Sequence, residues 1–175
     1  KPVKQQIEEG ILFHKWRYRR AVSYLAYFQS FTNTYAPLEH LKDLYREALD
    51  YPGVIGLTIG TRPDCIDIEK LEYLRQLSEN YYITIEYGIE SCYDKTLKRI
   101  NRGHSFEEAV EAVEKTAAYG INTGAHFIFG LPGETTEDML AEASIISSLP
   151  LKTVKFHQLQ ILRGTAMEVE YNNNA

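Results

Sequence analysis

The sequence has few cysteines, no long apolar run and no excess of positive charge. Its two cysteines, Cys65 and Cys92, lie far apart without a metal-ligand spacing, which favours a reducing, cytoplasmic setting. No apolar run is long enough to cross a membrane and no signal-peptide pattern opens the chain, so we expect no membrane partner. The net charge of −5 gives no general attraction for nucleic acid.

Basic residues are nevertheless concentrated near the start of the chain. Residues 1–20 contain six lysines and arginines against Glu8 and Glu9, and residues 15–20 read KWRYRR. A basic arm that contacts RNA and a solvated helix face both fit this pattern, and the solvated face is the commoner of the two.

Helical and strand patterns alternate along the chain. We predict helices over 3–18, 37–51, 67–77, 94–100, 105–120 and 135–149, and strands over 23–28, 54–59, 82–87, 123–129 and 154–162. No hairpin signal interrupts the alternation, and each strand is a nearly continuous apolar run, as expected when both faces of a sheet are covered. With 175 residues, the chain is predicted to be one α/β domain with a parallel sheet, either a barrel or an open doubly wound sheet.

The chain is organised around residues 125–134, AHFIFGLPGE. An apolar strand ends there in a turn that contains Gly130 and Gly133, and a helix follows at once. Glycines let the backbone of such a turn approach a planar or anionic ligand. A well-formed turn that binds nothing fits equally well.

Polar side chains follow each predicted strand. They are Gln29, Thr32 and Asn33; Thr61, Arg62 and Asp64; Glu86, Glu90 and Ser91; Glu134; and His157 and Gln158. Because the carboxyl ends of parallel strands meet at one edge, these groups predict a functional site there. We do not expect Glu86 and Glu90 necessarily to reach the same ligand.

Four segments resemble a known family. They are YFQSFTNTYAP (27–37), IGTRPDC (59–65), GIESCYDKTLKRINRGHS (88–105) and HFIFGLPGET (126–135). Together they resemble the radical S-adenosylmethionine (SAM) enzymes of the coproporphyrinogen-dehydrogenase type, and in particular the YhcC/YtqA family. The resemblance extends from Tyr24 to Thr165.

The resemblance implies a partial (β/α)6 TIM-like barrel that holds SAM beside a [4Fe-4S] cluster. Reductive cleavage of SAM in such enzymes gives a 5′-deoxyadenosyl radical, with electrons from an external donor such as flavodoxin or ferredoxin. The chain then divides into a basic first helix (1–20), βα repeats (21–165) and the start of a C-terminal extension (166–175).

The resemblance also places SAM contacts on this sequence. Ser30, Thr32 and Asn33 replace the glycine-rich turn that receives the methionyl amino group, although they could instead satisfy their own backbone. Glu90 stands where relatives have a ribose-binding Gln, with Arg102 as its partner; an ordinary ion pair between the two is compatible with this role. The remaining candidates are His126, at the position of a ribose-binding Asp, then Ile128 and Gly130 at the adenine, with Gln160 and Leu162 as further candidates at that edge.

Three residues are candidates for substrate binding. Arg62 and Asp64 could hold substrate or the SAM carboxylate, or form a surface salt bridge. His157 is either a substrate contact or a satisfied core histidine. If the interpretation is right, Ser30, Glu90 and Ile128 should lie on one face of the molecule.

One part of the family pattern is missing. Radical SAM clusters are held by three cysteines spaced CxxxCxxC, and no such spacing occurs in this sequence. We therefore interpret the chain as a fragment truncated at its first barrel strand, without an intact cluster and inactive alone. A sheet edge left open in this way favours self-association.

Two other functions fit parts of the pattern. A conventional aldolase-type barrel would need a catalytic lysine at a strand end, for which Lys155 is the candidate, and a phosphate-type barrel would need two glycine-rich loops, of which the second is absent from this sequence. A degenerate barrel would bind nucleotide or RNA without redox chemistry. The resembling family has itself been associated with tRNA wobble-uridine modification, in which residues 15–20 could contact phosphate and stack on bases.

Overall fold

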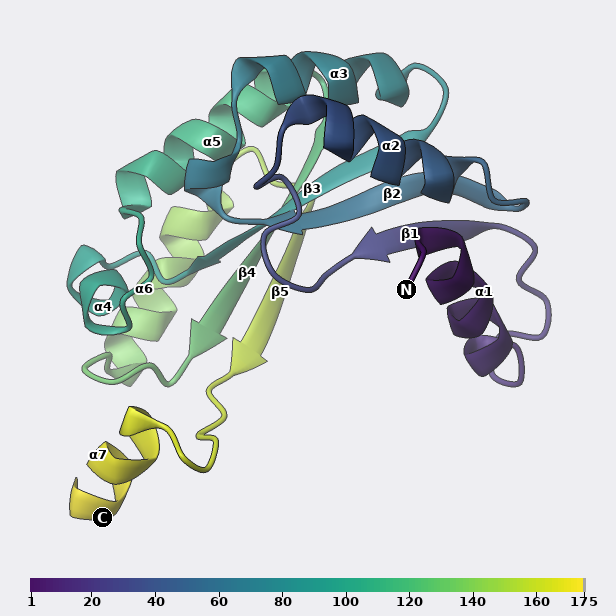
Figure 1. The fold of residues 1–175 in the computed structure, drawn as a ribbon. Coiled ribbons are helices and arrows are strands. Elements are labelled where there is room, and N and C mark those ends of the chain that lie inside the picture. The colour runs from purple at the N-terminus through teal and green to yellow at the C-terminus, as the bar shows by residue number, and fades with distance from the viewer. Residues whose placement is uncertain (175) are drawn as a thin grey trace.

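Five parallel strands form a single curled sheet in the computed structural model, which describes residues 1–174 (Figure 1). The strands are β1 (Tyr24–Phe28), β2 (Val54–Thr61), β3 (Tyr82–Glu90), β4 (Asn122–Phe129) and β5 (Thr153–Gln158). They lie side by side in sequence order, and every neighbouring pair is parallel. The sheet is therefore a half-barrel, and the predicted parallel α/β fold is confirmed.

Helices connect the strands as crossovers. They are α1 (Val3–His14), α2 (Leu38–Leu49), α3 (Ile68–Ser78), α4 (Asp94–Arg99), α5 (Phe106–Ala118), α6 (Thr136–Ser147) and α7 (Ala166–Asn174), with a short 3-10 turn η1 at Pro63–Cys65. Ser105 and Glu108 form a capping box at the start of α5, and Thr135 forms another with Asp138 at α6. Within the described residues, no helix is both long and apolar enough to cross a bilayer.

Several predicted boundaries were wrong. Helix α1 ends at His14 rather than at residue 18, because the carbonyl of His14 accepts from the amides of Arg17 and Tyr18 in a turn. Strand β5 ends at Gln158 rather than at residue 162, after Leu159 donates the last bond to the carbonyl of Phe129. Residues 166–174, taken only as the start of an extension, form helix α7.

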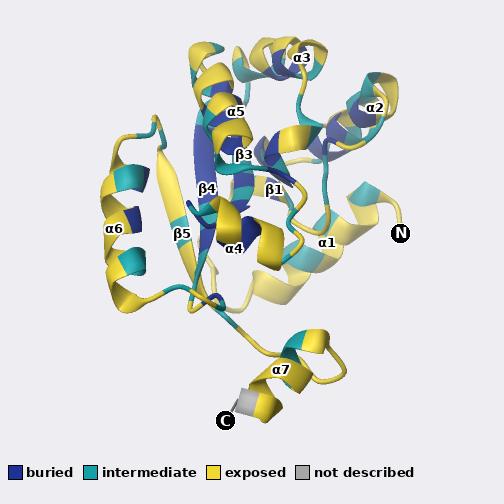
Figure 2. Cartoon of the chain, turned by 90° about the vertical axis from the view of Figure 1, so that its left-hand side faces the viewer, coloured by how far each residue is buried: buried dark blue, intermediate teal, exposed yellow. Residues whose placement is uncertain are grey.

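The prediction that both faces of the sheet are covered was also wrong. The outer face carries Leu57, Ile85 and Phe127, which are fully buried under the helices. The inner face carries half-buried polar groups, including Glu86 and His126, and none of the helices in residues 1–174 lies over it (Figures 1 and 2). Strand β5 is mostly exposed, as its yellow colour in Figure 2 shows. The inner face is therefore the part of the sheet open to a ligand.

Close pairing of β2 with β3 requires Gly56. It pairs with Tyr82, and an ideal Cβ at Gly56 would lie 2.7 Å from the carbonyl carbon and 2.9 Å from the Cα of Tyr82. These are backbone atoms of a central strand, so they cannot move aside as a flexible side chain would.

Gly56→Ala is expected to lower the free energy of unfolding by about 2 kcal/mol or more, because the added methyl group forces the two strands apart. Gly10→Ala is the matched control, since nothing lies within 4 Å of a Cβ at this position in α1. It should leave stability unchanged or raise it by roughly 0.5–1 kcal/mol. Urea denaturation of both variants measures the difference, and equal stabilities would contradict the pairing.

Candidate functional site

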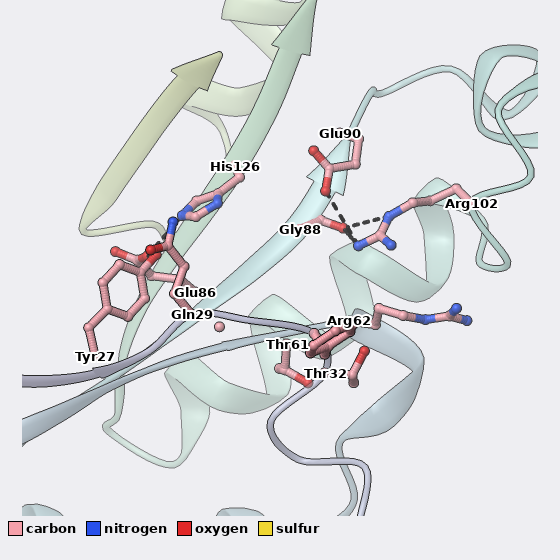
Figure 3. A pocket seen from close by; sticks show the side chains of 12 residues that line it. Tyr27, Gln29, Thr32, Thr61, Arg62, Glu86, Gly88, Glu90, Arg102 and His126 are labelled. Atoms are coloured by element: carbon pink, nitrogen blue, oxygen red, sulfur yellow. Dashed lines mark hydrogen bonds and ion pairs between the residues drawn. The ribbon is translucent and has the colours of Figure 1, made fainter. Parts of the chain in front are cut away.

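A cavity of about 300 Å³ opens on the inner face of the half-barrel. It is lined by Tyr27, Gln29, Phe31, Thr32, Gly60, Thr61, Arg62, Glu86, Gly88, Glu90, Arg102 and His126. Figure 3 shows two groups of side chains on its opposite sides: Glu90 with Arg102 and Arg62 on one, and Tyr27, Glu86 and His126 on the other. We call the first group the strand-end side of the cavity and the second group the Glu86 cluster.

On the strand-end side, Arg102 holds the end of β3. Its Nε donates to the carbonyl of Gly88 at 3.1 Å, and its Nη2 lies 3.4 Å from Oε1 of Glu90. A Cβ at Gly88 would lie 2.6 Å from both Nη2 of Arg102 and Oε1 of Glu90. Glycine at position 88 therefore leaves open the space in which the ends of these two side chains approach each other.

The backbone turns sharply at Glu90. Its φ of 75° lies in the left-handed region, which non-glycine residues seldom adopt, and the register of β3 with β4 shifts between Gly88 and Glu90. The next turn is tied to α6, because the amide of Cys92 donates to Oε1 of the buried Glu142 at 2.7 Å. This conformation presents the Glu90 carboxylate to the cavity.

Burial shifts the ionisation of both partners. Burial raises the pKa of Glu90 above its ordinary value, and the charge of Arg102 only partly opposes this rise. Burial likewise lowers the pKa of Arg102, and the negative charge of Glu90 partly opposes this fall. A ligand that hydrogen-bonds to the carboxylate of Glu90 would stabilise its charged form.

Arg62 and Asp64 form a bidentate ion pair. The Nε and Nη2 atoms of Arg62 donate to the two carboxylate oxygens of Asp64 at 2.9 and 2.6 Å. The hydrogen bond from Arg62 holds the pKa of Asp64 below its usual value. The salt bridge between Arg62 and Asp64, one of the alternatives expected from the sequence, is therefore formed. Of the two residues, only Arg62 lines the cavity.

The three polar residues that follow β1, Ser30, Thr32 and Asn33, have different surroundings. Thr32 lines the cavity. The Asn33 side-chain amide donates to the carbonyls of Phe28 and Gly60, both at 2.9 Å, so it satisfies backbone groups as the alternative had it. Ser30 lines a second cavity of about 910 Å³ between α1 and β1. Ser30 therefore lies outside the cavity that Glu90 lines, and the expectation that Ser30, Glu90 and Ile128 share one face stays a prediction.

Residues from β4 and β5 lie along the inner face. Ile128 is half-buried two residues beyond His126 and is paired with His157, but it does not line the cavity. Gly130 adopts a φ of 86° in the exposed turn after β4, outside the cavity. His157 is exposed, which rules out the core-histidine alternative, and its ring centroid lies 5.4 Å from that of His126.

The Glu86 cluster occupies the other side of the cavity. Three groups converge on Oε2 of Glu86: the hydroxyl of Tyr27 at 2.6 Å, Nε2 of His126 at 2.8 Å and Nζ of Lys155 at 3.3 Å. The ammonium of Lys155 also donates to the Tyr27 hydroxyl at 3.2 Å. Four residues from β1, β3, β4 and β5 therefore form one hydrogen-bonded network across the half-barrel.

The network sets the charge of its members. Burial alone would raise the pKa of Glu86, but hydrogen bonds from Tyr27 and His126 and the charge of Lys155 outweigh it, so this pKa is lowered. Burial lowers the pKa of His126, and the hydrogen bond to Glu86 only partly offsets this. Near neutral pH the cluster consists of an ionised Glu86, a neutral His126 and a charged Lys155.

Sequence reasoning missed this cluster, although a signal was present. Glu86 and Glu90 are four residues apart on one strand, and an even separation places both on the same face. Both line one cavity, on its two opposite sides, which is compatible with the expectation that they need not reach the same ligand. Tyr27 and Lys155 were not considered as its neighbours, because only tertiary structure brings β1 and β5 to β3.

The described residues do not fit an iron–sulfur cluster. Among residues 1–174, no three His, Cys, Asp or Glu side chains are grouped so that they could hold a metal ion. Cys65 is a half-buried free thiol and Cys92 a buried one. Burial, reinforced by Glu142, raises the pKa of Cys92 far above its ordinary value, which disfavours the thiolate that a metal needs.

The fold and cavity define a class of protein, a parallel half-barrel with a polar ligand site on its inner face near the strand ends. Residues 3–144 match the family model of the Radical SAM superfamily, and the chain belongs to that superfamily.

Sequence relatives agree with this assignment. An uncharacterized protein, MJ0486, of Methanocaldococcus jannaschii is 40% identical over 97% of this chain and 52% of its own length. YtqA of Bacillus subtilis is 38% identical over 91% of this chain and 49% of its own. YhcC of Escherichia coli is 36% identical over 85% of this chain and 48% of its own length. The resemblance to the YhcC/YtqA family is therefore confirmed. The chain spans about half the length of these relatives.

More distant proteins are similar in sequence or in fold. A tRNA uridine(34) acetyltransferase of Methanocaldococcus infernus is 27% identical over 65% of this chain and 21% of its own length. The solved structure of Elp3 from the same organism, with an N-terminal deletion, has a TM-score of 0.82 and 18% identity over 99% of this chain and 45% of that one. Escherichia coli coproporphyrinogen III oxidase, HemN, has a TM-score of 0.64 and 18% identity over 75% of this chain and 30% of its own.

Glu86→Gln tests the ionised state of the Glu86 cluster. Because the folded-state pKa of Glu86 lies below the ordinary value of 4.5, its charge stabilises the fold above pH 4.5. This stabilisation is lost as the pH falls from 4.5 through the folded-state pKa. We expect Glu86→Gln to lower the free energy of unfolding by about 1 kcal/mol at neutral pH. Its loss of stability on acidification should be less steep than that of the unchanged protein.

Urea denaturation at a series of pH values measures both effects. Glu114→Gln, at an exposed position on α5, is the matched control and should follow the unchanged protein. Identical curves for the Glu86 and Glu114 variants would show that Glu86 is not held ionised by its three neighbours.

Proposed function

We propose that the strand-end side of the cavity binds SAM and that the protein is the core of a radical SAM enzyme. Membership of the superfamily supports this proposal, as does the placement of Glu90 and Arg102 in one cavity at the end of β3. The single observation that carries it is the contact of Glu90 with Arg102 across Gly88, because a side chain at Gly88 would fill the space they share.

Each residue has a definite part in the proposal. The carboxylate of Glu90 accepts hydrogen bonds from the ribose hydroxyls, and Arg102 holds it by charge while anchoring the carbonyl of Gly88. Thr32 offers a hydroxyl to the methionyl amino group. Arg62 offers its guanidinium to the methionyl carboxylate, as it lines the same cavity.

SAM, when bound beside a [4Fe-4S] cluster and reduced by an external donor such as flavodoxin or ferredoxin, supplies a 5′-deoxyadenosyl radical. No group of thiolates among residues 1–174 is suited to hold that cluster, so we propose that this part of the chain alone is inactive. The protein is proposed to act in the reducing cytoplasm, where Cys65 and Cys92 stay as free thiols.

The alternative of an aldolase-type barrel enzyme is less well supported than the radical SAM enzyme. A Schiff-base barrel needs a lysine amine that is free and neutral. Lys155 is instead bound to Glu86 and Tyr27, and despite burial these contacts raise its pKa above the ordinary value. A degenerate nucleotide-binding barrel differs from the proposal in one respect, since it would bind adenosine without forming radicals from SAM.

Glu90→Ala in the full-length protein is expected to weaken SAM binding by about tenfold or more, because two ribose hydrogen bonds lose their acceptor. Glu90→Gln keeps an amide oxygen as an acceptor and should bind SAM within a few-fold of the unchanged protein. Isothermal titration calorimetry under anaerobic conditions measures both affinities. Glu114→Ala is the control, and an affinity for SAM that is the same in all variants would refute the proposed role of Glu90.

We further propose that the substrate is RNA, with tRNA as the candidate. One supporting observation is the similarity to a tRNA uridine(34) acetyltransferase. The other is the basic segment at residues 15–20, which leaves α1 and carries Trp16, 69% exposed, and Tyr18, 55% exposed. Exposed aromatic rings between arginines can stack on unpaired bases while the charges contact phosphate.

Reversing the charges of this segment tests the RNA proposal. In the full-length protein, the triple variant Arg17→Glu, Arg19→Glu and Arg20→Glu should bind tRNA at least about tenfold more weakly and with a smaller dependence on salt. Lys95→Glu with Lys98→Glu is the control, since both exposed lysines lie on α4, on the other side of the molecule from α1 (Figure 1). Fluorescence anisotropy at several salt concentrations gives both quantities, and unchanged tRNA binding in the triple variant would exclude this segment.

A further inference from the structure

Lys155 and His126 are neighbours on the inner face of the sheet. They are register partners on β5 and β4, and both are bound to the same oxygen of Glu86. Their side chains therefore meet at Glu86, where His126 lines the cavity opposite Arg102 and Lys155 lies just outside its lining. Figure 3 shows His126 there, with its ring meeting the carboxylate of Glu86. The proposed SAM contacts on the strand-end side do not involve Lys155.

The hydrogen bonds of the cluster determine which nitrogen of His126 carries the proton. An ionised Glu86 can only accept, so Nε2 of His126, 2.8 Å from Oε2, must donate. Since burial keeps the ring neutral, Nδ1 has no proton and is a hydrogen-bond acceptor. No other residue of the described chain is bonded to Nδ1.

Lys155 provides a donor beside this acceptor. Its ammonium group has three N–H bonds, and two of them are directed to Tyr27 and Glu86. Within the described chain the third has no hydrogen-bond partner, although Nζ lies 5.0 Å from the centroid of the Tyr27 ring, and the side chain is 41% exposed. The charge of Glu86 offsets that of Lys155, so the pair offers a directed N–H rather than a general attraction for anions.

We propose that Lys155 and His126 recognise an imide edge, in which a carbonyl oxygen lies next to an N–H group. The carbonyl oxygen accepts from Nζ of Lys155, and the N–H donates to Nδ1 of His126. Uracil carries this edge at its O4 and N3 atoms. The choice of uracil rests on the proposed RNA function. Glu86 is a positioning residue, since it fixes the tautomer of His126 and the direction of Lys155.

The arrangement also discriminates against other bases. Cytosine presents an amino group where uracil has O4, and an unprotonated N3 where uracil has N–H. Its amino group would face the ammonium of Lys155, and its N3 would face the lone pair of Nδ1. Both contacts are repulsive, and each leaves a protein group without its hydrogen bond.

The test compares three nucleosides on the full-length protein: uridine, cytidine and N3-methyluridine, which lacks the N–H. Saturation-transfer NMR titrations give the affinities. Uridine should bind about tenfold or more tightly than either of the others. Lys155→Met and His126→Gln should reduce this preference to within a few-fold. The glutamine amide can keep the bond to Glu86 but has no acceptor at the position of Nδ1.

Lys152→Met is the matched control, because it removes the same charge from an exposed position just before β5 and should preserve the preference for uridine. The proposal is overturned if uridine shows no binding, if all three nucleosides bind equally, or if the preference survives in Lys155→Met. SAM affinity measured on the same samples separates the two proposals. If the unchanged protein binds SAM but shows no preference for uridine, only the proposed recognition of uracil is refuted. If the unchanged protein does not bind SAM, the proposed function is refuted.

Discussion

The parallel pairing of β3 between β2 and β4 is the constraint on which the rest of the structure depends. It fixes the two faces of the central strand, with Ile83, Ile85 and Tyr87 on the buried side and Glu86 and Glu90 on the other. Shifting the register by one residue would bury both carboxylates under the helices and expose the isoleucines. The apolar packing that stabilises the sheet therefore also holds the ligand groups in place.

The two sides of the cavity use charge differently. Glu90 and Arg102 lie 3.4 Å apart, too far for a strong hydrogen bond, and burial opposes the charge on each. The carboxylate of Glu86 instead has three donors within 3.3 Å and a lowered pKa. The first pair thus has unused hydrogen-bonding capacity for a ligand at the carboxylate itself. The second is a completed network that leaves only the outer atoms of Lys155 and His126 available.

Much of the fold follows from the sequence. The alternation of helical and strand patterns is a local signal, and the structure has the expected elements in the expected order. The open inner face was missed because threonine, tyrosine and glycine interrupt the strands without making them look polar. In Ile83-Thr84-Ile85-Glu86, for example, the alternation is present but was read as a continuous apolar run.

The candidate site could be predicted only in part. Glu90, Arg102, Arg62, Thr32 and His126 were placed by family motifs, and the structure brings them to one cavity. Ser30 does not line this cavity, since the direction of a loop side chain depends on the loop conformation, and Phe31 beside it adopts a φ of 65°. Lys155 and Tyr27 are separated by 128 positions, so only the closure of the sheet could show that they meet.

The most direct test of the central claim is a crystal structure of the full-length protein with SAM bound. The account predicts that the ribose hydroxyls lie within hydrogen-bonding distance of Glu90, with Arg102 still bound to the carbonyl of Gly88. SAM found elsewhere, such as in the cavity between α1 and β1, would contradict it.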